Sequence, residues 1–316
     1  MNKRKTNIQK MKNRRRKVLK NRIFLIVFFI ILIFVIKNIW SLRDDKKNED
    51  KFYNLIGTDK RPNEIIEKPT ETTEPITDST TSESNKGKDE NEWKKAVKQA
   101  ISKNSNAQIV FDNFDSLPED LKRMSGTNPD TIDFVAKYAD YSIEYKYDYP
   151  DKIYDDMDYP YYIQWDQKWG YQKYGTGIIG NAGCAPTSLS MMLSGIKNRK
   201  VTPDEIAKLV EENGHTGDYG TNWDVYPFIA KEYNLEVTQV PNDLNSIKKQ
   251  LDKGSPIIIS VGPGTFTSVS HVMLIVGYDN NNRLKIYDPN NLQNSEKTWK
   301  FSSFSKEIKN MWAYSK

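Results

Sequence analysis

The chain has 316 residues, of which 37% are hydrophobic and 28% are charged, and its formal net charge is +5. This length allows one or two domains with additional tails, and the low hydrophobic content indicates that part of the chain does not pack into a core. A single cysteine excludes an internal disulfide framework. With only two histidines in addition, the composition argues against a metal centre, and we expect no cofactor.

The positive charge is concentrated at the N-terminus. Residues 1–43 carry 13 lysines and arginines and no acidic residue. Residues 44–158 carry 17 basic against 27 acidic residues, and residues 159–316 carry 17 against 15. The basic excess therefore belongs to a tail, and we expect no nucleic-acid-binding face on the rest of the chain.

An apolar run follows the basic tail of residues 1–22. Residues 23–36 read IFLIVFFIILIFVI, which is short for a membrane span and long enough for the core of a signal peptide. No small-x-small cleavage site follows, and Trp40 suits a membrane interface. We predict a single transmembrane anchor at residues 23–40, with the N-terminus cytoplasmic and the C-terminal part extracellular. A cleaved signal peptide is the alternative.

Two segments separate the anchor from the C-terminal half. Residues 41–90 are rich in Thr, Ser, Glu, Pro and Lys, cannot bury enough apolar surface to fold, and are predicted to form a disordered stalk. Residues 91–150 are predicted to form a small helical segment, because Trp93, Val97 and Ile101 share one helix face and Asn128 before Pro129 is typical of a helix start. Its role stays open between inhibition, substrate docking and completion of the core.

The C-terminal half, residues 155–316, contains amphipathic helices followed by apolar strands, which predicts an α+β fold with an antiparallel sheet. No phosphate-binding loop is present, because Gly262-Pro263-Gly264 precedes a strand and not a helix. The expected helices are residues 203–213, 223–232 and 244–253, and the expected strands are residues 255–261, 271–278 and 284–287, with a last strand or turn near Trp299.

Cys184, the single cysteine, lies at a predicted helix start. Residues 180–183 form a polar turn, Pro186 suits a first helical turn, and residues 189–193 continue an apolar helical pattern. A helix N-terminus carries partial positive charge and free N–H groups. Both favour a thiolate over a thiol, and the thiolate is the nucleophilic form. Cys184 is therefore a candidate nucleophile.

A nucleophile needs a base, and the two histidines differ in their surroundings. His215 lies in a polar loop, whereas His271 opens a predicted buried strand. The turn signal at residues 279–282 predicts a hairpin that brings Asp288 roughly opposite His271. An acid beside a histidine can hold one tautomer and stabilise its charged form. Cys184, His271 and Asp288 thus form a candidate catalytic triad.

Several segments resemble a known family. IQWDQKWGYQKYG, GCAPTSLSMM, GTNWD, SVGPGTFTSVSHVMLIVGYD, IYDPNN and the closing NSEKTWKFSSF and MWAYSK are similar to the extracytoplasmic branch of the bacteriocin-processing (double-glycine leader) cysteine peptidases, members of the papain-like superfamily. The resemblance covers about residues 155–316 and implies a papain-like fold. It also implies that Cys184 is the nucleophile, His271 the general base and Asp288 the orienting acid.

The resemblance further implies an oxyanion-hole glutamine before the cysteine. Gln164 holds the family's position, although the gap from Gln164 to Cys184 is longer than in transporter-fused members. Gln167 and Gln172 are the competing candidates.

The combined interpretation is hydrolysis of peptide bonds through a thioester, with peptide or protein substrates and cell-wall components as further candidate partners. One alternative is a cell-surface acyltransferase or amidase that acts on cell-wall or protein substrates. Another is a non-catalytic surface-binding module with a relic triad. Cell-wall hydrolases with a Cys-His-His triad are disfavoured, because the third member here is an acid. Leader cleavage coupled to export is not expected, since residues 1–316 contain no ATP-binding cassette.

Overall fold

The computed structural model describes residues 81–217 and 220–316. The predicted basic tail, the predicted anchor at residues 23–40 and most of the predicted stalk lie outside the described residues. Within the two described ranges, no helix is long and apolar enough to cross a membrane.

A helical segment opens the described part of the chain. Its helices are α2 (Thr81–Ala100), α3 (Asn106–Asn113), α4 (Glu119–Thr127) and α5 (Ile132–Ala139). Val97, one of the three residues that predicted a helix face, is fully buried. The Asn128 side chain accepts a hydrogen bond from the Asp130 backbone N–H at 3.2 Å and caps the short turn before α5. The helix start predicted at Asn128 is therefore confirmed.

Helix α2 begins earlier than the predicted helical segment. The stalk was expected to extend to residue 90, whereas α2 starts at Thr81. Once a helix has nucleated, each further residue adds a backbone hydrogen bond, so packed turns near Val97 can extend toward the N-terminus through polar sequence. Composition alone does not indicate this extension, because residues 81–90 contain no hydrophobic residue.

The C-terminal half contains a six-stranded sheet in the order β5-β10-β6-β7-β8-β9, in which each neighbouring pair is antiparallel. Its strands are β5 (Glu236–Gln239), β6 (Ile257–Val261), β7 (His271–Tyr278), β8 (Leu284–Tyr287), β9 (Thr298–Trp299) and β10 (Ile308–Ser315). The mixture of helices and antiparallel sheet confirms the predicted α+β class.

Two strands of this sheet were not predicted from the sequence. The C-terminal strand β10 lies between β5 and β6, and it follows β9, which forms at the last strand or turn that the sequence predicted near Trp299. A register shift between Ile308 and Asn310 interrupts the alternation of β10, and β5 has a single apolar residue, Val237, so neither strand shows a clear apolar alternation in its sequence.

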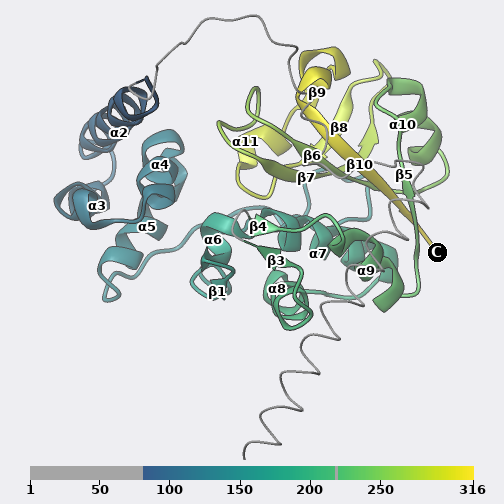
Figure 1. Cartoon of the computed structure of the whole chain (residues 1–316), viewed down its shortest axis with the longest axis horizontal. Helices are drawn as coiled ribbons and strands as arrows, with labels where there is room; N and C mark the ends of the chain where they lie inside the picture. The colour runs from purple at the N-terminus through teal and green to yellow at the C-terminus, as the bar shows by residue number, and fades with distance from the viewer. Residues whose placement is uncertain (1–80, 218–219) are drawn as a thin grey trace, which may run out of the picture. The chain divides into compact units, whose positions relative to one another are not determined.

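Helices cover both faces of the sheet. Ile258 and Leu274 belong to the core that contains Leu189 of α7 (Cys184–Lys197), whereas the alternate residue Ile259 packs in the core that contains Ile247 of α10 (Leu244–Leu251). Figure 1 shows α7, α8 (Pro203–Glu212) and α9 (Val225–Glu232) together on one side of the sheet. Burial on both faces explains the continuous apolar run of β6, and it places α7 against β7.

Candidate active site

Cys184 is the first residue of α7, as predicted from the sequence. The short helix α6 (Ile179–Ala182) and Gly183 precede it. A Cβ atom at Gly183 would lie 2.5 Å from the Ile179 carbonyl oxygen, so this tight approach requires glycine. Cys184 is half-buried, and its position at the helix start leaves its backbone N–H without an intrahelical partner.

His271 is the first residue of β7 and is 6% exposed. On α7, one turn after Cys184, the Ser188 hydroxyl donates to the carbonyl oxygen of Val272 at 3.2 Å. This bond fixes the start of α7 beside the start of β7. His271 Nε2 lies 2.8 Å from Asp288 Oδ1, which leaves Nδ1 as the ring nitrogen that is free to face another group. The structure therefore brings together the predicted histidine and acid.

Asp288 directly follows β8 and is 1% exposed. Besides the His271 contact, its carboxylate accepts the Asn290 backbone N–H at 2.9 Å and the Asn294 Nδ2 at 2.8 Å. A buried carboxylate needs such partners to offset the loss of water. The role of Asn294 was not predicted from the sequence. Asn294 lies in α11 (Leu292–Ser295), whose start is capped by the Asn291 side chain.

The electrostatic surroundings of His271 favour its charged form. Burial by itself lowers the pKa of the imidazole. The charge and hydrogen bond of Asp288, together with the hydrogen bond and charge of Cys184, outweigh burial and raise the pKa of His271 to about 10. The imidazole is thus in interaction range of both predicted partners, and these partners favour its protonated form.

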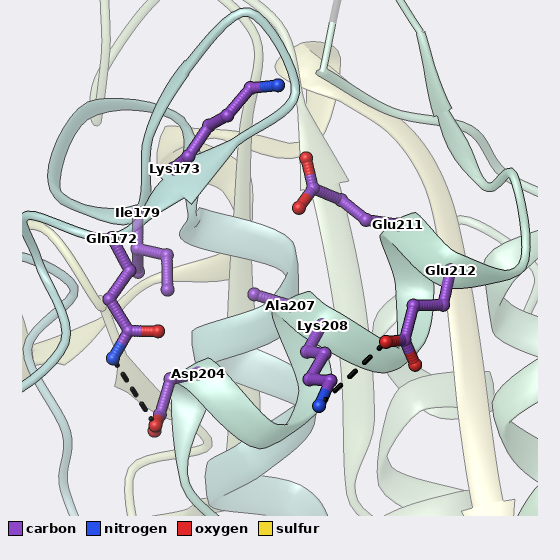
Figure 2. Close-up of a pocket in the computed structure, with 8 residues that line it drawn as sticks. All are labelled: Gln172, Lys173, Ile179, Asp204, Ala207, Lys208, Glu211 and Glu212. Atoms are coloured by element: carbon purple, nitrogen blue, oxygen red, sulfur yellow. Dashed lines mark hydrogen bonds and ion pairs between the residues drawn. The ribbon is translucent and has the colours of Figure 1, made fainter.

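The three candidate glutamines differ in the partners of their side-chain amides. Gln164 is 3% exposed, and its Nε2 donates to the carbonyl oxygen of Gly180 at 2.9 Å, four residues before Cys184. Gln167 instead donates to the Tyr145 carbonyl oxygen, at 3.2 Å. Gln172 lines a surface pocket and points at the Asp204 carboxylate, 3.4 Å away (Figure 2). Of the three side-chain amides, only that of Gln164 donates to the turn that leads into α7.

Two tyrosines near Cys184 were not predicted as part of the site. Burial raises the pKa of Tyr174, and the charge of Cys184 raises it further. The same two effects raise the pKa of the fully buried Tyr226. The Tyr174 and Thr221 hydroxyls lie 2.6 Å apart. These tyrosines come from β1 (Lys173–Tyr174) and α9, so the sequence shows no short-range signal that joins them to Cys184.

The second histidine forms a separate pair. His215 Nδ1 lies 3.0 Å from Asp224 Oδ1, and its ring lies against Phe228. In the described ranges, no three His, Cys, Asp or Glu side chains are grouped as metal ligands. The Gly262–Gly264 turn joins β6 to β7, where the following Thr265 is held by the Glu307 carboxylate.

Comparison with known proteins places this site in a family. The model of the Peptidase_C39 like family matches residues 157–316, which is half of the chain. Among solved structures, the chain is similar to the peptidase domain of Streptococcus ComA, described as a bi-functional ABC transporter involved in a quorum sensing pathway. That likeness has 21% identity and a TM-score of 0.34, and it covers 42% of this chain and 91% of the other. No curated protein matches the chain. From the match over residues 157–316, the chain belongs to the Peptidase_C39 like family and is a cysteine peptidase.

Proposed function

We propose that the protein is a membrane-anchored extracytoplasmic peptidase that cleaves peptide bonds with the triad Cys184, His271 and Asp288. The observation that carries this proposal is the buried 2.8 Å contact of His271 Nε2 with Asp288, beside a cysteine at a helix start. In this arrangement Cys184 is the nucleophile, His271 is the base and Asp288 is the orienting acid.

In the first half of the reaction, the Cys184 thiolate attacks the carbonyl carbon of the scissile bond. The negative oxygen that forms is bound by the Cys184 backbone N–H and by Gln164. Gln164 Nε2 carries two N–H groups, and the bond to Gly180 uses one, which leaves the second for the substrate. His271 then protonates the leaving amine, and a thioester with Cys184 is left.

In the second half, neutral His271 removes a proton from water, and the hydroxide attacks the thioester carbonyl carbon. The C–S bond breaks, the peptide acid leaves, and the proton returns the imidazolium–thiolate pair. Asp288 stays ionised throughout and stabilises the imidazolium. The network from Asn290 and Asn294 to its carboxylate supports this role.

The proposed location is the outer face of the cell membrane. Its support is the basic tail of residues 1–22, which precedes the apolar run of residues 23–36. The stalk that begins at residue 41 would hold the peptidase away from the bilayer.

Alkylation of the full chain tests the proposed mechanism, since Cys184 is the only cysteine. At about pH 6, iodoacetamide should modify Cys184 faster than a free thiol, whose pKa is about 8.5, and His271→Ala should remove this advantage. His215→Ala is the matched control, because His215 also pairs with an aspartate but belongs to the separate pair. An unchanged rate in His271→Ala would refute the ion pair.

Product analysis then separates peptide cleavage from the alternative acyl transfers. The chain is incubated with a peptide library, with and without an added amine, and with purified cell-wall fragments. Hydrolysed peptides support the peptidase function. New amide products would instead support an acyltransferase, and cleaved cell-wall amides an amidase.

A further inference from the structure

The helical segment α2 to α5 lies before the family match, which begins at residue 157. Its buried residues nevertheless belong to the same hydrophobic core as residues of α7, such as Leu189. Two of its side chains also contact backbone groups that hold the proposed catalytic residues. We propose that Asn128 and Phe134 are positioning residues of the active site, which fix the supports of Asp288 and Gln164. This inference rests on the proposed function of the triad.

Asn128 uses both ends of its amide. The Oδ1 atom caps the turn before α5, and Nδ2 donates to the carbonyl oxygen of Asn290 at 3.1 Å. The Trp165 indole N–H donates to the same oxygen, also at 3.1 Å. The carbonyl of Asn290 is therefore held by one donor from the helical segment and one from the residue next to Gln164.

Asn290 in turn contacts Asp288, the proposed orienting acid. Its own backbone N–H donates to Asp288 Oδ1, the oxygen that contacts His271. The carbonyl and the N–H of Asn290 lie on two peptide planes that meet at its Cα, so a held carbonyl restricts the rotation of this residue, and Asn128 thereby limits the position of this donor. A donor aimed at Oδ1 stabilises the charged carboxylate, which in turn sustains the imidazolium.

Phe134 supports the part of the site that holds Gln164. It is fully buried, and its ring stacks on Tyr171 with centroids 4.4 Å apart and planes 11° apart. The Tyr171 hydroxyl donates to the Phe134 carbonyl oxygen at 2.9 Å. The ring and the backbone of Phe134 are thus both held by Tyr171, the residue after Gly170.

Two glycines make room for the Phe134 ring. A Cβ atom at Gly180 would lie 2.2 Å from Phe134 Cζ, and one at Gly170 would lie 2.7 Å from Phe134 Cε2. The Gly180 backbone N–H donates to Gly170 O at 2.8 Å, and Gly180 O accepts from Gln164. The Phe134 ring therefore packs against Gly180, whose carbonyl oxygen accepts the hydrogen bond of the Gln164 side chain.

Together these contacts assign the helical segment a role that the sequence left open. The helical segment supports Asp288 through Asn128, and it supports Gln164 through Phe134. It is therefore part of the structure that the active site requires. An inhibitory segment would have to be displaced for activity, whereas displacement of this one removes both supports.

Asn128→Ser gives the sharpest test, with alkylation of Cys184 by iodoacetamide at about pH 6 as the readout. Serine retains a capping oxygen but cannot reach Asn290. A less restrained Asp288 lowers the proton affinity of His271, so less of the Cys184–His271 pair is ionised. We expect alkylation to slow about two- to tenfold, the value of one hydrogen bond, and the melting temperature to fall by about 2–4 °C.

Asn106→Ser is the matched control. Its amide donates to Asp133 within the helical segment at 2.8 Å, so this variant also loses one side-chain hydrogen bond but leaves Asn290 untouched. It should alkylate at the wild-type rate.

A paired substitution tests Phe134 separately. Gly180→Ala places a methyl group against the ring and should slow alkylation, while Phe134→Ala with Gly180→Ala removes the clash and should recover part of the rate. Circular dichroism gives the folded fraction of each protein. A double variant no faster than Gly180→Ala would overturn the role of Phe134.

The outcomes separate the two proposals. Fast wild-type alkylation that depends on His271 but is unchanged in Asn128→Ser would overturn the role of Asn128 and leave the triad standing. Wild-type alkylation at the rate of a free thiol, insensitive to His271→Ala, would overturn the triad and the positioning roles with it.

Discussion

His271 and Asp288 form a buried pair, with Nε2 of the imidazole 2.8 Å from Oδ1 of the carboxylate. Seventeen positions separate the two residues in the chain, and the β7–β8 hairpin brings them together. Because Nε2 is used by the acid, Nδ1 is the nitrogen that can serve Cys184. This assignment determines which substitutions should change the reaction and in which direction.

The first prediction concerns the acid. In Asp288→Asn, the new Oδ1 can still accept from His271, and the Asn294 amide can turn to accept from the new Nδ2. We expect kcat/KM to fall about 10- to 100-fold, and about tenfold further in Asp288→Ala, which orients nothing. Steady-state kinetics on a cleaved peptide measure both. Equal activity in the wild type and Asp288→Ala would remove this residue from the triad.

The second prediction concerns pH. The imidazolium that protonates the leaving amine is present below the pKa of His271, which the site raises to about 10. Activity should therefore persist through neutral pH and fall as the pH rises through about 10. Asp288→Asn removes a charge that raises this pKa, so the alkaline limb should move to lower pH. A kcat/KM profile from about pH 5 to about pH 11 measures the limb, and a shift to higher pH would contradict the assignment.

The third prediction concerns the oxyanion hole. Gln164→Ala and Gln164→Glu both remove the N–H donor, and we expect each to lower kcat about 100- to 1,000-fold with little change in KM. Gln172→Ala is the control, because Gln172 faces Asp204 in a separate pocket (Figure 2). Equal losses in the Gln164 and Gln172 variants would argue for general destabilisation.

The fourth prediction concerns Asn294, which the sequence did not single out. Its Nδ2 donates to Asp288 Oδ2 at 2.8 Å, so Asn294→Ala leaves one oxygen of a buried carboxylate with fewer partners. We expect kcat to fall about tenfold, because the carboxylate that orients His271 is no longer fixed at Oδ2. Gln108→Ala loses an exposed amide-to-carboxylate bond to Asp112 and should leave kcat unchanged.

The fifth prediction concerns topology. Protease added to cells stripped of their wall should digest the C-terminal half and leave a small membrane-bound fragment that contains residues 23–40. Antibodies against each end of the chain follow the two parts. A C-terminal half protected from the protease would contradict the orientation, and a released protein that begins after Trp40 would show a cleaved signal peptide.

The sequence by itself determined the local features of the site. A turn followed by Pro186 and a helical apolar pattern placed Cys184 at a helix start, and the turn at residues 279–282 predicted the hairpin between β7 and β8. These features depend on neighbouring residues, whose backbone preferences act over a few positions. The α+β class followed from the same local patterns.

The tertiary structure decided the relationships between distant residues that no turn or motif in the sequence indicated. It distinguished Gln164 from its two competitors, because only Gln164 donates to Gly180. It inserted β10 between β5 and β6, and it brought Asn128 to Asn290, 162 positions away. Such contacts form when separate elements bury their apolar faces in one core. Local sequence patterns predict that a face is buried, but they do not predict which element packs against it.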